Sequence, residues 1–251
     1  MPGIELPFSA FILAGGLGKR LQSVVFDRPK PLAMVNDKPF LEILIESLAH
    51  KGVRDFVLLT GYKGDMIENH FMRQRKLNIR FSHELVPLGT GGAVKNAEEF
   101  ATDPTLLVNG DTFFDANLEK LHRFHLTKRA GVTLSLVRAE NVGRYGSVII
   151  DKNDFVTGFC EKSQESIGPG FINAGLSLLS LKAIRNLPFG KPFSMENEIF
   201  PLLAQSREMA GFYQDRPFFD IGTPESYDEF KIFVKKSTTE SSQSITNMHH
   251  S

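Results

Sequence analysis

The chain has 251 residues with 29 basic and 29 acidic side chains, and this zero formal net charge offers no field that would attract nucleic acid or an anionic membrane surface. Its length suits one large α/β domain, or a domain with a modest appendage, that buries a substantial core. One cysteine, Cys160, excludes an internal disulfide framework, no apolar run approaches about 18 residues, and no basic segment precedes an apolar one at the N-terminus, so we expect a cytoplasmic protein.

The first predicted element is a strand over residues 11–14 that runs directly into a glycine-rich loop. Its short apolar run is typical of a strand buried on both faces. Three glycines and three cations follow: Gly15, Gly16, Gly18, Lys19, Arg20 and Lys30. Glycine lets the backbone turn sharply and lets amide N–H groups approach the oxygens of a ligand closely. The segment therefore predicts a cradle for several phosphates.

Other glycine-rich motifs differ from this loop. A nucleotide-triphosphatase phosphate loop requires Ser or Thr where this chain has Arg20, and a dinucleotide fingerprint requires a third glycine where it has Leu21. A glycine-rich turn with solvated cations remains the alternative at this point.

Apolar strands then alternate with helices. Apolar residues at helical spacing predict helices over 41–48 and 67–71, and apolar runs predict strands over 55–60, 78–83 and 105–108. Such alternation predicts a largely parallel sheet covered by helices. Ligands bind such sheets beyond the carboxyl ends of the strands, so the residues that follow each strand are candidates for a site.

Two polar or glycine-rich segments lie at such strand ends. Residues 84–93 form a second glycine-rich loop that enters a helix, and residues 109–111 are Asn-Gly-Asp. The carboxylate of Asp111 is a hard oxygen ligand of the kind that Mg²⁺ uses together with substrate phosphates. An Asx turn or a helix cap is the alternative role for this aspartate.

A second aspartate repeats this pattern near the C-terminus. Asp220 follows an apolar strand, and Thr223 and Pro224 are a good N-cap and a good first helical residue. We therefore expect Asp220 to be held before a fixed helix start and to join Asp111 at a metal site.

Short β segments replace the alternation between these aspartates. We expect a strand over 131–137, a hairpin of 147–150 with 155–160, and a strand that begins at 171. These segments predict a lid for a second substrate, in which Glu161, Lys162 and Asn173 hydrogen-bond hydroxyls and a phosphate. A solvated strand end is the alternative for the first two.

The last segments carry no chemical motif. A helix is expected over 194–205, with Ser194 as its cap and Ile199, Leu202 and Leu203 as its buried face, and the Ser/Thr-rich residues 235–251 predict a flexible tail. His122 and His125 are interpreted as surface or packing residues.

Eight segments in this order resemble the sugar-1-phosphate nucleotidyltransferase family, and the resemblance runs from residue 11 to about residue 230. The segments are 13–21, 29–31, 87–93, 109–111, 144–146, 159–162, 173–175 and 219–224. The resemblance implies an α/β fold with a Rossmann-like, mostly parallel mixed sheet flanked by helices, similar to the glycosyltransferase-A type, and a small β-rich lid that binds the sugar. It also implies one domain over 1–234, with a nucleotide-binding part at about 8–137 and a sugar-phosphate-binding part at about 138–222.

The resemblance also assigns roles to residues. The nucleotide-binding residues would be Leu13, Ala14, Gly15, Gly16, Gly18, Lys19, Arg20, Lys30, Glu84, Pro87, Gly89, Thr90, Asn109 and Asp111. The sugar-phosphate-binding residues would be Gly110, Tyr145, Gly146, Glu161, Lys162, Asn173 and Asp220. The catalytic residues would be Arg20, Lys30, Asp111, Lys162 and Asp220, with Mg²⁺ held by Asp111 and Asp220. Lys19 departs from the family, which has a small hydroxyl residue there.

Within the family, residues 21–31, the short length and the Arg-Tyr-Gly element look most similar to D-glycero-α-D-manno-heptose 1-phosphate guanylyltransferases. This implies GTP and a sugar 1-phosphate as small-molecule substrates, with no nucleic acid or membrane partner and with a homo-oligomer left open. The alternatives are a mannose-1-phosphate guanylyltransferase, a uridylyl-, thymidylyl- or cytidylyltransferase that acts on hexose phosphates, and a non-catalytic nucleotide-sugar sensor. A nicotinamide-dependent oxidoreductase lacks support because the third glycine is missing.

Overall fold

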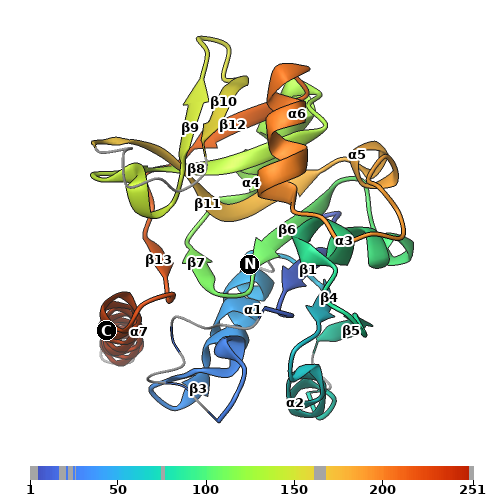
Figure 1. The fold of residues 1–251 in the computed structure, drawn as a ribbon. Helices are drawn as coiled ribbons and strands as arrows, with labels where there is room; N and C mark the ends of the chain where they lie inside the picture. Colours follow the sequence, from blue (N-terminus) through green and yellow to red (C-terminus); the bar gives the residue numbers. More distant parts are fainter. Residues whose placement is uncertain are drawn as a thin grey trace.

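A mixed nine-stranded sheet forms the centre of the computed structural model, which describes residues 5–16, 21, 25, 27–74, 77–160 and 168–248 (Figure 1). The strands are β1 (Ala10–Leu13), β2 (Met34–Val35), β3 (Lys38–Pro39), β4 (Asp55–Thr60), β5 (Asn78–His83), β6 (Thr105–Asn109), β7 (Thr112–Phe114), β8 (Val132–Ala139), β9 (Ser147–Ile150), β10 (Val156–Cys160), β11 (Gly170–Leu179), β12 (Met209–Tyr213) and β13 (Phe218–Asp220). The helices are α1 (Phe40–His50), α2 (Gly64–Phe71), α3 (Gly89–Asn96), α4 (Leu118–Lys128), α5 (Leu181–Arg185), α6 (Phe200–Gln205) and α7 (Pro224–Met248).

The strand order is β10-β9-β11-β6-β1-β4-β5, and β8 pairs with both β11 and β12. Strands β6, β1, β4 and β5 are mutually parallel, whereas β11 runs antiparallel to β6. This arrangement confirms the predicted mixed, mostly parallel sheet between helices. It also places the ends of β1, β4, β5 and β6, with the loops that follow them, at one edge.

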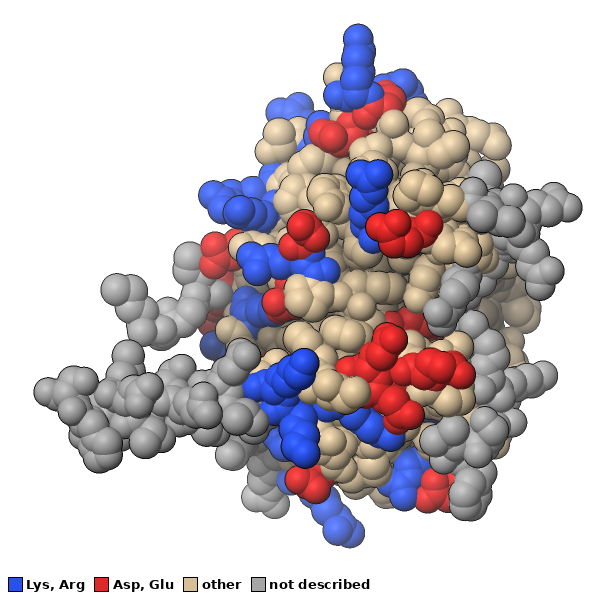
Figure 2. Space-filling view, turned by 90° about the vertical axis from the view of Figure 1, so that its left-hand side faces the viewer, with Lys and Arg blue, Asp and Glu red and all other residues tan. Residues whose placement is uncertain are grey.

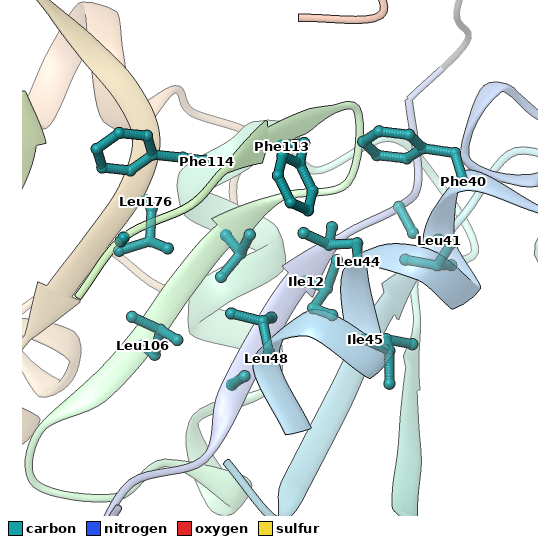
Figure 3. Close-up of a cluster of buried hydrophobic side chains, with 14 of the residues drawn as sticks. Ile12, Phe40, Leu41, Leu44, Ile45, Leu48, Leu106, Phe113, Phe114 and Leu176 are labelled. Carbon is teal, nitrogen blue, oxygen red and sulfur yellow. The ribbon is translucent and has the colours of Figure 1, made fainter. Parts of the chain in front are cut away.

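Strand β1 is buried on both faces, as its apolar run predicts. Ala10 and Ile12 belong to one hydrophobic cluster and Phe11 to the other, and all three are fully buried. Because successive side chains of a strand point to opposite faces, the strand contributes to the core on each side of the sheet. Helix α1 covers the first face with five buried side chains (Figure 3), namely Phe40, Leu41, Leu44, Ile45 and Leu48.

The predicted lid shares its sheet with the part that is predicted to bind the nucleotide. Strand β11 is ten residues long, and it pairs with β6 through 176–179 and with β8 through 170–173 and 177–179. One long strand therefore joins the two parts, and the hairpin β9–β10 extends the same sheet at its edge (Figure 1). The sequence pattern does not predict this continuity because strand pairing between distant segments leaves no local signal.

The expected helix over 194–205 is correct in place, and its predicted buried face is correct for Ile199 and Leu203, which are partly buried against the core, but wrong for Leu202. A π-helical turn, Met195–Ile199, precedes α6, and Ser194 caps it by accepting a hydrogen bond from the Asn197 N–H. The wider turn shifts the helical phase, so Met195, Phe200 and Ala204 are buried while Leu202 is 60% exposed.

Helix α7 continues through most of the segment that the composition predicts as a flexible tail. Its backbone is helical as far as Met248. The start of the helix is packed through Tyr227 and Phe230, and an anchored helix gains one hydrogen bond for each further residue. Helical propagation can therefore extend beyond the last apolar contact.

Basic and acidic side chains are interspersed on the face shown in Figure 2, in keeping with the balanced composition. Among the described residues, no helix is both long enough and apolar enough to cross a membrane.

His125 is a buried packing residue of α4. Its Nδ1 lies 2.8 Å from the Thr133 Oγ1, and only 4% of the residue is exposed. Burial, reinforced by the nearby His122, lowers the pKa of His125 from its usual 6.5 to about 4. This confirms that it is a satisfied packing residue.

We predict that the free energy of unfolding falls by up to about 3 kcal/mol as pH drops from 6.5 to 4, because the unfolded chain binds a proton on His125 that the folded chain excludes. Urea unfolding between pH 7 and pH 4 measures this loss. His125→Leu should flatten the pH dependence in this range, and an unchanged slope would show that other groups cause it.

Candidate active site

Two adjoining cavities open at the edge of the sheet where β1, β4 and β6 end. The first has a volume of about 610 Å³ and the second about 240 Å³. Both are lined by Thr90, Asn109, Asp111 and Glu196, so these four residues mark their shared boundary. The arrangement suits two substrates that meet at this boundary.

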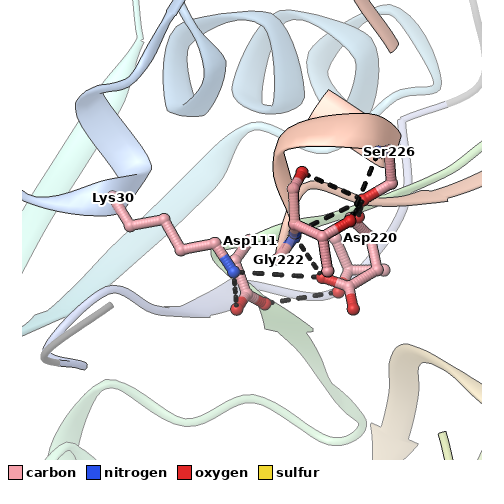
Figure 4. A network of polar contacts seen from close by, with 7 residues as sticks. Lys30, Asp111, Asp220, Gly222 and Ser226 are labelled. Atoms are coloured by element: carbon pink, nitrogen blue, oxygen red, sulfur yellow. Dashed lines mark hydrogen bonds and ion pairs between the residues drawn. The ribbon is translucent and has the colours of Figure 1, made fainter. Parts of the chain in front are cut away.

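The two predicted aspartates meet at this boundary (Figure 4). Asp111 precedes β7, and β13 pairs antiparallel with β7 so that Asp220 lies opposite Thr112. The Ile221 N–H donates to the Asp111 carbonyl at 3.1 Å, which fixes the two backbones relative to each other. The structure therefore brings together two carboxylates that are far apart in the sequence.

Lys30 lies between these carboxylates. Its Nζ is 2.7 Å from the Asp111 Oδ2 and 3.9 Å from the Asp220 Oδ1. The side chain of Lys30 is only 8% exposed, and its backbone is fixed in a 3₁₀ turn, Lys30–Leu32, between two prolines. One largely buried ammonium thus faces two carboxylates, of which Asp220 is also mostly shielded from solvent whereas the side chain of Asp111 is 38% exposed.

Asp220 is held by the residues that begin α7. The Gly222 N–H donates to the Asp220 Oδ1 at 2.8 Å, and the Ser226 hydroxyl donates to the Asp220 carbonyl (Figure 4). A Cβ at position 222 would lie 2.8 Å from the Asp220 Oδ1, so only glycine allows the carboxylate to fold back onto this N–H. The predicted Thr223 cap and Pro224 helix start are confirmed.

The donor set fits a divalent cation. Two carboxylates on fixed backbones, next to cavities large enough for phosphate-bearing substrates, match the way in which Mg²⁺ is bound through one or two carboxylates plus substrate oxygens. The described part of the chain contains no group of three or more His, Cys, Asp or Glu residues that could hold a metal alone. A metal here would therefore take its remaining ligands from water or from the substrates.

We predict that Gly222→Ala raises the metal concentration needed for half-maximal activity by about 10-fold, because the added methyl pushes the Asp220 carboxylate off its N–H donor. A titration of initial rate against Mg²⁺ measures this. Gly131→Ala is the control, since a Cβ there makes only ordinary contacts at 3.4 Å or more and neither glycine has a positive φ, and an equal change in both variants would point to a general effect of the added methyl.

The first cavity contains the residues predicted to bind the nucleotide. Leu13, Gly15, Gly16, Lys30, Glu84, Pro87, Gly89, Thr90, Asn109 and Asp111 all line it. Ala14 is buried in the core, and Gly18, Lys19 and Arg20 lie outside the described residues. Residues that the sequence did not single out, including Tyr62, His83 and Leu85, complete the wall.

Glu84 is the first residue of the second glycine-rich segment, residues 84–93. Its Oε2 accepts a hydrogen bond from the Leu88 N–H at 3.1 Å, and its Oε1 lies against the backbone of Gly15 and Gly61, where a Cβ would clash. Burial raises the pKa of Glu84, and the hydrogen bond from Leu88 opposes that shift. Gly15 of the first loop is thus needed for contact with Glu84 as well as for the predicted access by a ligand.

The glycines of residues 89–92 pack against Phe193. A Cβ at Gly89 would clash with the Phe193 carbonyl, and one at Gly91 would enter the Phe193 ring. The Gly91 N–H also donates to the Phe193 carbonyl at 3.0 Å. These residues form the start of α3 rather than an open loop, so close packing accounts for part of the glycine pattern.

The second cavity contains only part of the set predicted for the sugar phosphate. Tyr145, Asn173 and Asp220 line it, Gly110 lines the first cavity instead, and Gly146 lines neither cavity. Glu161 and Lys162 lie outside the described residues. A bulge in β11 after Asn173 interrupts its pairing with β8, as is common beside functional sites.

Gly110 has a structural reason to be glycine. Its N–H donates to the Leu13 carbonyl at 2.9 Å, and a Cβ would clash with that carbonyl. Close approach between the ends of β1 and β6 therefore explains this position.

The second cavity is also lined by Ser194, Glu196 and Asn197, for which the sequence pattern predicted no binding role. Their clustering in one short segment was the available signal, and it was interpreted only as a helix start.

Comparisons with known proteins agree with this geometry. The family model described as Nucleotidyl transferase matches residues 9–237. A D-glycero-alpha-D-manno-heptose 1-phosphate guanylyltransferase from Campylobacter jejuni is 38% identical over 224 residues, which cover 89% of this chain and 98% of that protein. The enzyme of the same name from Aneurinibacillus thermoaerophilus is 38% identical, with 87% and 94% covered. A mannose-1-phosphate guanylyltransferase from Mycobacterium tuberculosis is 34% identical, and the match covers 87% of this chain but 62% of that protein.

Solved structures show the same likeness. The crystal structure of HddC from Yersinia pseudotuberculosis is 36% identical, with a TM-score of 0.81 over 90% of this chain and 99% of that one. A structure of HddC complexed with GMP-PN has a TM-score of 0.77 over 88% of this chain and 97% of that one.

Proposed function

Because the chain belongs to the nucleotidyl transferase family, we propose that it transfers a guanylyl group from GTP to D-glycero-α-D-manno-heptose 1-phosphate, giving GDP-heptose and pyrophosphate. The observation that carries the proposal is the Asp111–Lys30–Asp220 cluster at the boundary of two cavities. Relatives of this name match along nearly their whole length, which supports the same choice of base and sugar.

The reaction needs positioning and charge more than proton transfer. A sugar 1-phosphate already offers an anionic oxygen, which attacks the α-phosphorus of GTP in line while pyrophosphate departs. Repulsion between the two polyanions and the charge on the leaving group oppose this step. Lys30, with Arg20 and Lys162 as predicted from the sequence, would bind and orient the phosphates. Mg²⁺ held by Asp111 and Asp220 would supply further positive charge at the phosphate oxygens.

The decisive experiment is pyrophosphate release in the presence of Mg²⁺, with GTP, UTP, dTTP and CTP crossed with heptose, mannose and glucose 1-phosphates. Activity confined to GTP and the heptose phosphate is the expected result. Activity with another pair would keep the reaction and overturn the specificity, with mannose 1-phosphate as the first alternative because a mannose-1-phosphate guanylyltransferase is 34% identical. A folded protein that binds nucleotide but releases no pyrophosphate with any pair would favour a sensor.

A further inference from the structure

Glu196 lies at the boundary of the two cavities, where neither the metal cluster nor the predicted sugar set includes it. It lines both cavities from the π-helical turn, Met195–Ile199. Met195, the preceding residue, is 1% exposed and so anchors the turn in the core. Glu196 is therefore presented to the substrates by a fixed segment.

Two hydroxyl groups orient its carboxylate. The Thr90 hydroxyl donates to the Glu196 Oε2 at 2.6 Å, and the Ser194 hydroxyl donates to the same oxygen at 2.9 Å. Each hydroxyl has one proton, and each also accepts a backbone N–H, from Met195 at 2.9 Å for Thr90 and from Asn197 at 3.2 Å for Ser194. The backbone thus fixes the direction of both hydroxyls, so that both protons point at Glu196.

Among the residues that the structure describes, no cation satisfies the remaining acceptor capacity of Glu196. Among the described residues, no lysine, arginine or histidine forms an ion pair with this carboxylate, and it belongs to no group of three carboxylates that could hold a metal. An ionised carboxylate only accepts hydrogen bonds and repels phosphates. In a cavity for two polyanions, it must face the part of a ligand that carries neutral donors.

We propose that Glu196 accepts hydrogen bonds from hydroxyl groups of the sugar 1-phosphate and so determines sugar specificity, an inference that rests on the proposed function. Besides Glu196 and the two aspartates of the metal cluster, the polar side chains that line the second cavity are neutral, among them Asn173, Asn197 and Tyr145, and such groups suit a polyol. Thr90 and Ser194 act as positioning residues that hold the carboxylate toward this cavity.

The proposal is tested with Glu196→Ala and with Glu196→Gln, which keeps the size of the side chain. A hydrogen bond to a charged group corresponds to an affinity change of about 10- to 100-fold, so the KM for heptose 1-phosphate should rise by that factor in Glu196→Ala. The KM for GTP should stay within about twofold. Glu198→Gln is the matched control, because Glu198 lies in the same turn, lines neither cavity, and should leave both constants unchanged.

A binding measurement separates this proposal from the proposed function. The affinity ratio of GDP-heptose to GDP, measured by calorimetry, reports the sugar contribution without turnover. This ratio should fall by about 10-fold or more in Glu196→Ala, while affinity for GDP stays constant. Ser194→Ala should lower the ratio by a smaller factor, and Ser194→Thr should restore it.

Three outcomes overturn the proposal. An unchanged ratio in Glu196→Ala, with wild-type protein active on GTP and the heptose phosphate, refutes the role of Glu196 and leaves the proposed function standing. A change confined to GTP or GDP affinity places Glu196 at the nucleotide instead. A wild-type protein that binds GDP-heptose no better than GDP would show that the second cavity adds no net affinity for the sugar, which overturns the proposal, whereas pyrophosphate release still decides the proposed function.

Discussion

Replacement of Asp111 by asparagine is expected to lower turnover by at least about 100-fold at saturating GTP and sugar phosphate. The substitution removes one negative charge where the two cavities meet, beside the Lys30 ammonium at 2.7 Å. One preorganised electrostatic element of a catalytic site contributes about 3 kcal/mol to the barrier, which corresponds to this factor. Initial rates of pyrophosphate release at saturating Mg²⁺ measure the effect.

The fold should tolerate this substitution. Asparagine has the same size, and the hydrogen bond from the Ile221 N–H goes to the backbone carbonyl of residue 111, which the substitution keeps. Asp115→Asn is the matched control, because Asp115 forms an ion pair with Lys51 at 2.6 Å and lines neither cavity. Near-normal turnover of Asp111→Asn at saturating Mg²⁺ would remove Asp111 from the metal site.

Elements with a strong local signal were predictable from the sequence. The apolar run before Gly15 predicted β1, and the run over 55–60 predicted β4 with its observed bounds. The rule that ligands bind beyond strand ends then predicted that Asp111 lies at a site. Asp220 followed from its position before a helix start. In β1 and β4 the local sequence preference and the burial of the side chains favour the same element. The sequence alone was therefore sufficient to predict these two strands.

Two kinds of feature were not predictable from the sequence: contacts between distant segments, and a local irregularity within a helix. Glu196 is oriented at the cavities by a hydrogen bond from the hydroxyl of Thr90, 106 residues earlier, and no spacing in the sequence records that contact. The exposure of Leu202 depends on one π-helical turn that changes the helical phase. The glycines of α3 were interpreted as ligand contacts, whereas the ring and carbonyl of Phe193 also require them.

Lys30→Met is expected to lower turnover by about 100-fold or more and, at the same time, to strengthen binding of Mg²⁺ to the free protein. Turnover falls because the variant loses a fixed cation beside the reacting phosphates. Binding of Mg²⁺ strengthens because in the wild-type protein the ammonium already occupies the Asp111 Oδ2 at 2.7 Å, so a metal must compete with it. In the variant the two carboxylates retain their repulsion and have no internal counter-ion.

Thermal unfolding without substrates measures the second effect. If the variant binds Mg²⁺ about 10-fold more tightly, its stabilisation by the metal grows by about 1.4 kcal/mol, which raises the Mg²⁺-induced shift in Tm by about 3–6 °C for a chain of this size. Lys38→Met is the control, since Lys38 pairs with Glu46 at 2.7 Å on the surface and lines neither cavity. Equal Mg²⁺ shifts in Lys30→Met and wild type would mean that the ammonium and the metal occupy different positions, and Lys30 would then act on the phosphates alone.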